Sequence, residues 1–495
     1  MSKIIIQNGN MCELDLPLKF AQKLYNEFAI RHPNAFYLRT RQRGMQNWDG
    51  KIHYITKTGQ FKIGLLPKVY DMCIEMGIKP KVVDMRQPLP KVSKVVTNIG
   101  KYKLRPEQEK AVKAVINNKI GNTPFHIGVL DYTVNAGKTL IMSSLYLSYK
   151  KQLKTLLITN DSDWLNQARE EFKQYLPGEN ITFVQGKVLN WSNFTIGMVQ
   201  SISRNMRFYQ KELSQIDMVL IDEADQGGSR QYQNVITRLF NTRIRIGLSG
   251  TIYMSKLAKD KVKNMNLECF FGKVLAEFKL RDSIKKGYST KTVVKMVPGK
   301  PWYGNWESDC ISYKEIYDDS ITNSYTAWLM AYSRLRWNIN QGRYPALVVC
   351  KHIAHCENLY KFFKKKLGDA YNIAYVHVNT KSKLRQQIMK DFRDGKIDIL
   401  VSTTIIARGK NFPKLRYLLN AASMDSQEKS IQFLGRLVRT DKSKKKVYLD
   451  DLHYPGNYLD RHGKHRKQYY QRQELKVILL DKLWKKHPNH SLIKS

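Results

Sequence analysis

Short apolar runs recur along most of the chain and alternate with segments whose apolar residues have helical spacing. Such runs predict strands buried on both faces, and their alternation with helices predicts parallel β-sheets covered by helices. Helices are predicted over 353–363 and 383–392. The fold class is therefore α/β, with two tandem parallel-sheet domains. The predicted strands are 127–130, 155–159, 194–199, 218–221 and 244–248 in the first series, and 346–350, 374–378, 397–401, 417–420 and 447–449 in the second.

The first part of the chain has a different pattern and predicts a small α+β domain. Residues 4–6 are strand-like, 18–30 predict a helix, and the positions around Ile52 and Tyr54 alternate. Gln87-Pro88-Leu89-Pro90 interrupts the pattern and predicts a linker. We therefore expect three parts: a basic nucleic-acid-binding domain over 1–96, and parallel-sheet domains over 97–287 and 288–495, the last with a basic tail.

Residues 126–139 have the pattern of a phosphate-binding loop. A strand pattern leads into Asn135-Ala136-Gly137-Lys138-Thr139, and an apolar helix pattern follows. Backbone N–H groups at the start of such a helix point at an anion, and the helix dipole favours negative charge there. Lys138 would then contact the β- and γ-phosphates of ATP, and Thr139 would be a ligand of Mg²⁺. Tyr132 stands where the full pattern has its first glycine, so the motif alone leaves a chance match open.

A carboxylate motif follows the strand predicted at 218–221. Asp222 and Glu223 lie at its carboxyl end, where α/β sheets bind ligands. We expect Asp222 to hold Mg²⁺ through water, and Glu223 to orient or deprotonate the attacking water. The next predicted strand ends in Ser249-Gly250-Thr251. Three strands that end in these three motifs favour ATP chemistry over the alternative, in which the two carboxylates cap a helix.

Other polar residues flank the predicted strands. Arg105 and Gln108 begin a helical pattern before the loop, and the Gln108 amide suits the donor and acceptor edge of adenine. In the second half, Arg436 and Arg439 are three residues apart, so a helix would place both on one face. Guanidinium groups can stabilise charge on a transferring phosphoryl group, and surface ion pairs are the alternative. Candidates for contacts to a nucleic-acid backbone are Gln200, Ser201, Thr403 and Thr404.

The charge balance points to a polyanionic partner. The chain has 84 Lys and Arg against 42 Asp and Glu, a net charge of +42, which favours nucleic acid over plain solubility as the reason. The basic tail from Asp441, with Tyr469 and Tyr470, either contacts DNA or is a solvated extension. A basic strip in the N-terminal domain either contacts phosphates or is a solvated face with Trp48 in the core. Its residues are Arg39, Arg41, Arg43 and Lys51, near Tyr37 and Trp48.

Neither a zinc site, a disulfide framework nor a membrane segment is expected from the remaining composition. The six cysteines lack metal-binding or disulfide spacing. The N-terminus lacks a signal-peptide core, and no apolar run is long enough to span a bilayer. We therefore expect a soluble cytoplasmic protein without a membrane partner.

Taken in order, these motifs resemble those of superfamily 2 helicases. The resemblance implies two RecA-like domains that bind ATP and Mg²⁺ between them, with nucleic acid lying across both. It implies ATP contacts from Gly409 and Asn411, and it assigns the coupling of hydrolysis to movement to Ser249, Gly250, Thr251 and Gln432. The motifs that carry it are Arg105/Gln108, Gly137-Lys138-Thr139, Asp222-Glu223-Ala224-Asp225, Ser249-Gly250-Thr251, residues 403–411 and Gln432-x-x-Gly435-Arg436-x-x-Arg439.

Within that superfamily the chain resembles the phage UvsW-type DNA helicases, through Asn47-Trp48-Asp49-Gly50, residues 135–139 and Lys351-His352. This resemblance implies a monomer that branch-migrates and unwinds branched or forked DNA in the host cytoplasm. An RNA helicase is the runner-up, because the Asp222–Asp225 box is shared with those enzymes. Gln432 and Gly250 argue against it, since RNA helicases usually have His and Ala there. A DNA-dependent translocase that does not separate strands is a further alternative.

Overall fold

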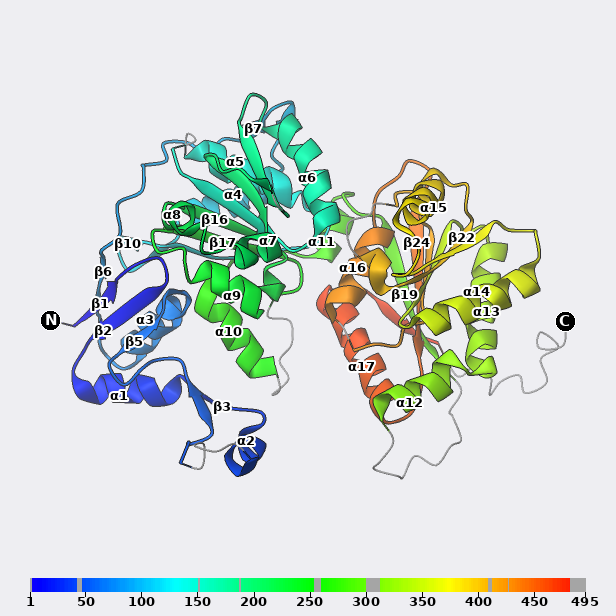
Figure 1. Ribbon diagram of the computed structural model, residues 1–495, viewed down its shortest axis with the longest axis horizontal. Coiled ribbons are helices and arrows are strands. Elements are labelled where there is room, and N and C mark those ends of the chain that lie inside the picture. The colour runs from blue at the N-terminus through cyan, green and yellow to red at the C-terminus, as the bar shows by residue number, and fades with distance from the viewer. Residues whose placement is uncertain are drawn as a thin grey trace. The chain divides into compact units, whose positions relative to one another are not determined.

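The computed structural model describes residues 2–41, 47–149, 152–186, 188–252, 260–299, 312–407, 412–425 and 427–480. The chain divides into two compact units, Met1–Phe278 and Lys279–Ser495. The first unit contains a small N-terminal sheet and a large sheet, and the second contains one large sheet (Figure 1). The predicted α/β fold with two parallel sheets after a small α+β part is confirmed. None of the helices in the described ranges has the length and apolar character that a membrane span requires.

The large sheet of the first unit has the strand order β14-β13-β15-β12-β16-β17-β11-β18. Only β14 runs antiparallel to its neighbour among these described strands. Its strands are β11 (His126–Tyr132), β12 (Thr155–Thr159), β13 (Ile181–Gln185), β14 (Val188–Leu189), β15 (Phe194–Met198), β16 (Met218–Asp222), β17 (Ile244–Ser249) and β18 (Val274–Phe278). The helices that cover it are α4 (Pro106–Ile116), α5 (Lys138–Ser148), α6 (Ser162–Tyr175), α7 (Val199–Arg204), α8 (Gln210–Ser214), α9 (Arg230–Ile236) and α10 (Lys261–Phe271).

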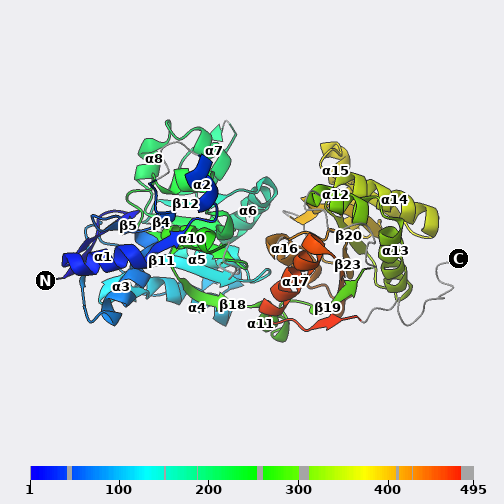
Figure 2. The ribbon, with the colours of Figure 1, turned by 90° about the horizontal axis from the view of Figure 1, so that it is seen from below.

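The sheet of the second unit is parallel throughout its described strands, in the order β21-β22-β20-β23-β24-β19-β25. Its strands are β19 (Lys291–Pro298), β20 (Ala346–Cys350), β21 (Ile373–Val376), β22 (Ile399–Thr403), β23 (Tyr417–Asn420), β24 (Lys446–His453) and β25 (Val477–Leu479). Its helices are α11 (Leu280–Lys285), α12 (Tyr313–Tyr317), α13 (Tyr325–Asn340), α14 (Ile353–Leu367), α15 (Ser382–Asp394), α16 (Gln427–Leu437) and α17 (Asn457–Arg472). Figure 2 shows α13 and α14 on one side of this sheet and α16 and α17 on the other.

Two adjacent buried carboxylates on β24 hold helices on opposite faces of this second sheet. Asp450 accepts a hydrogen bond from Arg334 Nε of α13 (2.8 Å), and Asp451 accepts one from Arg466 Nε of α17 (2.9 Å). Neighbouring residues of a strand point to opposite faces, so each carboxylate meets a different helix layer. Tyr470 of the basic tail also donates to Asp451 and is buried, so this side of α17 packs against the sheet and is not solvated.

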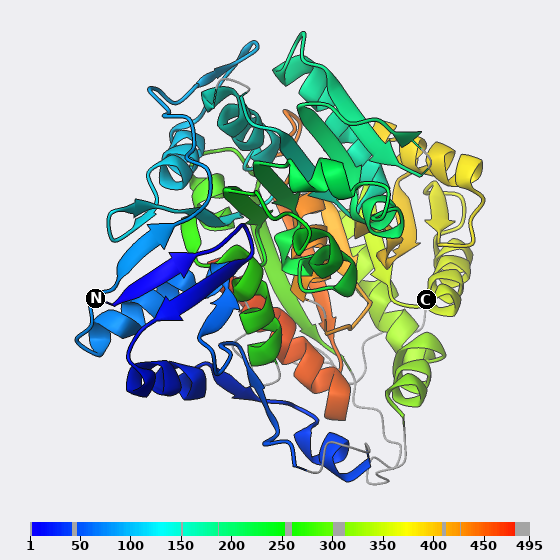
Figure 3. The same ribbon diagram turned by 60° about the vertical axis from the view of Figure 1, so that its left-hand side comes forward.

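The N-terminal part is a mixed sheet with a projecting hairpin. The sheet has the order β5-β2-β1-β6, and β3 pairs antiparallel with β4 outside it. Together with α2, this hairpin projects away from the rest of the unit (Figures 1 and 3). The helix predicted over 18–30 is too long, because Ala29 and Ile30 pair with β4 instead. The elements are β1 (Lys3–Ile6), β2 (Met11–Asp15), α1 (Leu18–Glu27), β3 (Ala29–Arg31), α2 (Ala35–Arg41), β4 (Lys51–His53), β5 (Gln60–Lys62), α3 (Leu66–Glu75) and β6 (Lys81–Asp84).

The N-terminal part shares one hydrophobic core with the first parallel sheet. Ile6 and Phe61 belong to the same buried cluster as Ile127 and Phe271. At Gly64 the two backbones meet directly, because a Cβ there would overlap the carbonyl oxygens of α10. The two parts are therefore packed as one body.

Arg245 joins the two parts by hydrogen bonds. It lies on β17 and is fully buried. Its Nη2 donates to the Gly9 carbonyl oxygen (2.6 Å) and to Asn10 Oδ1 (2.8 Å), and its Nη1 donates to the Phe270 carbonyl oxygen (3.2 Å). Burial lowers the pKa of Arg245 to about 9. Because a buried charge is costly without its hydrogen bonds, these contacts hold the turn before β2 against the parallel sheet.

The predicted linker lies in a segment without helix or strand, between β6 and Asn98. It is nevertheless fastened to the parallel sheet. Arg243 donates to the carbonyl oxygens of Gln87 (3.0 Å) and Pro88, and it forms an ion pair with Asp217 (2.7 Å). Arg86 donates to the Thr242 carbonyl oxygen (3.2 Å). The segment therefore holds the N-terminal part at a fixed position in the first unit.

We predict that Gly64→Ala lowers the free energy of unfolding of the first unit by about 1–3 kcal/mol, because the added methyl group must push two packed backbones apart. Urea unfolding followed by intrinsic fluorescence measures this change. Gly228→Ala is the matched control, because the nearest atom to its Cβ would be a Leu267 side-chain carbon at 3.7 Å, an ordinary contact. Equal stability of the two variants would contradict the close packing of the N-terminal part.

Candidate nucleotide-binding site

The phosphate loop lies where the sequence predicts it, between β11 and α5. Residues 133–137 connect the buried strand to the helix, and Asn135 and Gly137 have left-handed φ values of 63° and 72°. The first N–H groups of a helix have no partner within the helix, so the first turn of α5 offers donors to an anion at Gly137-Lys138-Thr139. The loop thus has the local geometry that phosphate binding requires.

Tyr132 replaces the first glycine of the usual motif without disturbing this loop. It is the last residue of β11, it is fully buried, and its hydroxyl donates to the Glu107 carbonyl oxygen (2.7 Å). Its ring packs near Phe278 of β18. The chain is still extended at this position and turns only after it, so no left-handed conformation is needed there.

Gln108 connects α4 to the phosphate loop. Its Oε1 accepts from the Arg105 backbone N–H (2.9 Å), and its Nε2 donates to the Ala136 carbonyl oxygen (2.8 Å). The side chain is fully buried. The structure therefore brings Arg105, Gln108 and residues 135–137 together, and the contact of Gln108 with adenine stays a prediction.

Asp222 ends β16 at the carboxyl edge of the sheet, two strands away from β11. It is 5% exposed, and burial raises the pKa of its carboxyl group, whereas the positive charge of Lys138 lowers it. Among the described residues its Oδ1 has no hydrogen-bond donor. A buried carboxylate oxygen without a donor fits a cation ligand, so Asp222 suits Mg²⁺, and Thr139 as a second ligand stays a prediction.

The structure describes no group of three or more His, Cys, Asp or Glu side chains that could hold a metal ion by itself. Magnesium at nucleotide sites is typically bound by one or two protein ligands together with water and phosphate oxygens. Glu223, the next residue, has a left-handed φ of 53°, which is uncommon for a residue with a side chain. Such strained positions cluster at functional sites.

The Ser249-Gly250-Thr251 segment lies between the loop and the carboxylate turn. Ser249 Oγ donates to Asp225 Oδ1 (2.8 Å) and accepts from the Thr251 N–H (3.1 Å). A Cβ at Gly250 would lie 3.1 Å from the Tyr132 carbonyl oxygen, so this backbone lies directly against the start of the phosphate loop. Asp225 was not among the predicted site residues, although it is the fourth residue of the carboxylate box and that position was its signal.

The predicted backbone-contacting residues of the first unit are already bonded within the protein. The strand predicted over 194–199 ends at Met198, and Gln200 and Ser201 lie on α7. Gln200 Nε2 donates to the Asn160 carbonyl oxygen (3.3 Å), and Ser201 Oγ accepts from the Gly186 N–H (2.9 Å). Their contact with nucleic acid stays a prediction. Arg41 is exposed at the end of α2, and Arg43 lies outside the described residues.

In the second unit the predicted residues fall on two adjoining segments. Thr403 ends β22 and is buried, and Thr404 begins a 3₁₀ turn, η5 (Thr404–Ala407). Lys429 Nζ of α16 donates to Thr404 Oγ1 (3.3 Å). Gln432 lies on the same helix. Gly409 and Asn411 lie outside the described residues.

The prediction that Arg436 and Arg439 share a helix face is wrong. The α16 helix ends at Leu437, so Arg436 is in its last turn and Arg439 lies beyond it. Two side chains bind backbone carbonyls at this end of the helix: Lys444 Nζ donates to the Leu437 carbonyl oxygen (3.1 Å), and Thr290 Oγ1 donates to the Arg439 carbonyl oxygen (3.1 Å). These bonds occupy carbonyl groups that a longer helix would use. Whether the two arginines act on phosphate stays a prediction.

Two family descriptions match the chain. "Type III restriction enzyme, res subunit" matches residues 101–254, and "Helicase conserved C-terminal domain" matches residues 331–441. Together they cover just over half of the sequence, and they include the loop, the carboxylate box and α16. This chain belongs to the superfamily 2 helicases.

Individual proteins are similar to this helicase at low identity. "Putative helicase 22" of Sulfolobus islandicus filamentous virus is 23% identical, over 71% of this chain and 64% of that protein. The crystal structure of T4 UvsW is 19% identical with a TM-score of 0.44, covering 97% and 98% of the two chains. The structure of Mss116p bound to single-stranded RNA and AMP-PNP is 14% identical with a TM-score of 0.54, covering 83% and 85%.

The Mss116p likeness shows that the fold of this helicase is shared with an ATP-analogue-bound protein, and the two sheets are RecA-like. The chain spans 64%, 33% and 59% of the lengths of the first three curated relatives that it matches. The family descriptions assign the chain to the superfamily 2 helicases and do not identify a nucleic acid.

We predict that Gly137→Ala weakens ATP binding to this helicase by about tenfold, because a left-handed alanine costs about 1–2 kcal/mol and its Cβ would overlap Gln108 Nε2. Titration with a fluorescent ATP analogue measures the affinity. Gly178→Ala is the control, because Gly178 has a φ of 81° and no atom within 4 Å of its Cβ. Unchanged affinity in Gly137→Ala would argue against the role of this loop.

Proposed function

We propose that this protein is an ATP-driven DNA helicase that unwinds and branch-migrates forked DNA, such as recombination or replication-fork intermediates. The observation that carries the proposal is the union of a basic N-terminal projection with the nucleotide-binding sheet in one rigid unit. A motor that remodels a fork needs a second contact with nucleic acid that moves together with its ATP site. The net charge of +42 supports a polyanionic partner.

The nucleotide end of this proposal rests on residues that the first unit brings together. Lys138 would neutralise phosphate charge, the α5 N-terminus would supply N–H donors, and Asp222 with Thr139 would hold Mg²⁺. The metal ion, when bound, would neutralise charge that develops on the phosphates. Glu223 would orient the attacking water as a general base. Arg436 and Arg439 are candidates for stabilising charge on the transferred phosphoryl group.

Coupling of hydrolysis to movement is proposed to pass through Ser249. Its hydroxyl bonds to Asp225 beside the catalytic carboxylates, and the following glycine lies against the phosphate loop. A shift of the carboxylate turn during the ATP cycle would therefore displace this segment. Such gating motions can change the spacing of nucleic-acid contacts and advance the protein along a strand.

DNA is favoured over RNA by two sequence features. Gln432 and Gly250 differ from the His and Ala that RNA helicases usually have, and Asn47-Trp48-Asp49-Gly50 resembles the UvsW-type DNA helicases. An RNA helicase is the alternative, because the fold is shared with Mss116p, which was solved with single-stranded RNA. A DNA-dependent translocase without strand separation is distinguished by a strand-displacement assay.

We predict that branched DNA stimulates ATP hydrolysis more strongly than RNA of matched length does. Steady-state ATPase rates without nucleic acid and with single-stranded DNA, branched DNA and RNA measure this preference, at one fixed salt concentration because affinity depends steeply on salt. Stronger stimulation by RNA would replace the DNA proposal with the RNA alternative.

We predict that Lys138→Ala abolishes hydrolysis, with a loss of more than about 10³-fold, and leaves DNA binding largely intact. ATPase rates and fluorescence anisotropy with labelled DNA separate the two effects. Lys113→Ala is the matched control, since this half-exposed lysine on α4 pairs with Glu109 and its loss changes the net charge equally. Retained turnover in Lys138→Ala would refute the assignment of the loop.

A further inference from the structure

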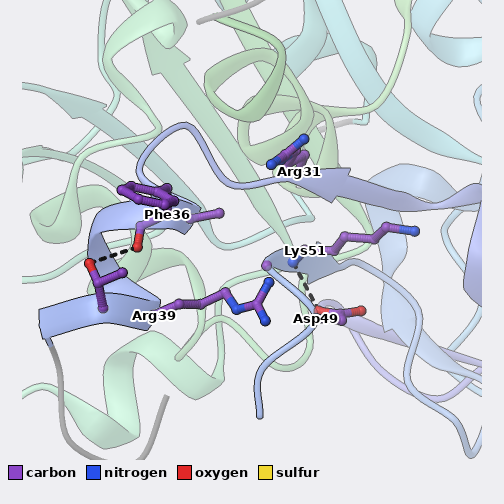
Figure 4. Close-up of a pocket in the computed structure, with 8 residues that line it drawn as sticks. Arg31, Phe36, Arg39, Asp49 and Lys51 are labelled. Atoms are coloured by element: carbon purple, nitrogen blue, oxygen red, sulfur yellow. Dashed lines mark hydrogen bonds between the residues drawn. The ribbon is translucent and has the colours of Figure 1, made fainter. Parts of the chain in front are cut away.

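The projecting hairpin and α2 enclose a hollow that the ATP chemistry does not use. It has a volume of about 500 Å³, which is within the range of ligand clefts. Figure 4 shows Phe36 and Arg39 on α2, Arg31 on β3 and Lys51 on β4 around it. These elements belong to the first unit, far along the sequence from the phosphate loop.

The Asn47-Trp48-Asp49-Gly50 turn builds one wall of this hollow. Trp48 Nε1 donates to the Lys51 carbonyl oxygen (2.9 Å), and the Gly50 carbonyl oxygen accepts from the His32 N–H (2.8 Å). Asp49 accepts from the Lys51 N–H (2.9 Å) and bonds to His53 Nε2 (2.6 Å). The turn thus closes the end of the hairpin, and it lies against α2 at Gly50, where a Cβ would be 3.1 Å from the Ala35 Cβ. Trp48 is partly buried.

The hollow is electropositive. Arg31, Arg39 and Lys51 are exposed, and none of them forms an ion pair within the described ranges of the chain. Among the described residues that line it, Asp49 is the only acidic one, and its hydrogen bond with His53 lowers the pKa of that carboxyl group. The hollow thus has three cationic side chains and one carboxylate, and that carboxylate already has two hydrogen-bond partners. Such an excess of positive charge fits an anionic ligand such as a phosphodiester.

Phe36 gives the hollow an aromatic face. Its side chain is 79% exposed on a short helix, next to the cation Arg39. Tyr37 is 55% exposed beside it, with Arg41 over its ring at 4.9 Å. An exposed phenylalanine gains nothing for stability in water, but exposed aromatic rings beside cations are the features of surfaces that stack unpaired bases.

We propose that this hollow binds an unpaired nucleotide of a DNA strand, with its phosphate held by Arg31, Arg39 and Lys51 and its base stacked on Phe36. This inference rests on the proposed function, because it names the strand that the N-terminal part would hold. A base within a duplex is already stacked on its neighbours, so Phe36 selects a single strand over a duplex.

The rigid connection of the N-terminal part gives this site a mechanical role. Arg245 and the fastened linker fix the four-stranded N-terminal sheet to the sheet that carries the phosphate loop, and the hydroxyl of Tyr54, directly after β4, donates to Asn266 Oδ1 of α10 (3.0 Å). A strand held at Phe36 therefore stays at a constant offset from the ATP site while the motor advances. That arrangement would keep one arm of a fork away from its complement.

The test compares single-stranded and blunt duplex DNA of matched length by fluorescence anisotropy with the full-length protein. Phe36→Ala is expected to weaken single-strand binding about tenfold with little effect on duplex binding. Phe36→Trp keeps an aromatic ring and is expected to bind single strands as the unaltered protein does. Arg39→Gln is expected to reduce the slope of log affinity against log salt by about 1. Leu18→Ala on α1 is the matched control, since Leu18 is 86% exposed but lies outside the hollow.

Unchanged single-strand affinity in Phe36→Ala, or an equal loss on single strands and duplex, would overturn this inference. Photocrosslinking from a 5-iodouracil base gives a second readout, with the crosslink expected on the α2 peptide and a crosslink elsewhere counting against the site. Failure of the proposed function is distinguishable, because it would appear as the absence of DNA-stimulated ATP hydrolysis in the unaltered protein. If DNA stimulates ATP hydrolysis by the unaltered protein but Phe36→Ala does not change single-strand affinity, the proposed function stands and only the site in the hollow is refuted.

Discussion

The buried guanidinium of Arg245 is the constraint on which the first unit depends. A charge without water must keep all of its hydrogen-bond partners, and those partners here are backbone and amide oxygens of two different parts of the chain. The N-terminal turn cannot move away from the parallel sheet without leaving that charge unsolvated. A domain that looks separable in sequence is therefore part of the framework of the first unit.

In the candidate nucleotide site, too, single side chains connect two parts of the chain. Gln108 bonds to the start of α4 and to the phosphate loop, and Ser249 bonds to the carboxylate turn while its neighbour lies against the loop. Each motif thus contacts another directly through the protein. Such contacts would hold the phosphate-binding and carboxylate residues in fixed relative positions, as a site for phosphates and a metal ion requires.

Strand positions were the most predictable feature, because fully buried parallel strands such as 155–159 and 218–221 are continuous apolar runs. The phosphate loop and carboxylates were equally visible, since local chemistry defines them. Long-range contacts were not: nothing near Arg439 signals that Lys444 and Thr290 end the helix, and nothing near Tyr470 signals that Asp451 buries it. Tyr132 departs from the first glycine of the motif, and its place in the structure could not be predicted because its partner, Glu107, comes from another element.

The adjacent aspartates of β24 have a consequence for how the second sheet assembles. Side chains alternate between faces along a strand, so sliding β24 by one residue would exchange the layers that Asp450 and Asp451 face. After a slip in either direction, one of the two arginines, Arg334 or Arg466, would meet Leu449 or Leu452 instead of a carboxylate. An apolar strand alone would pair with its neighbours almost equally well in several alignments. These two charges make one alignment far more favourable than the rest, so they specify the register of the sheet.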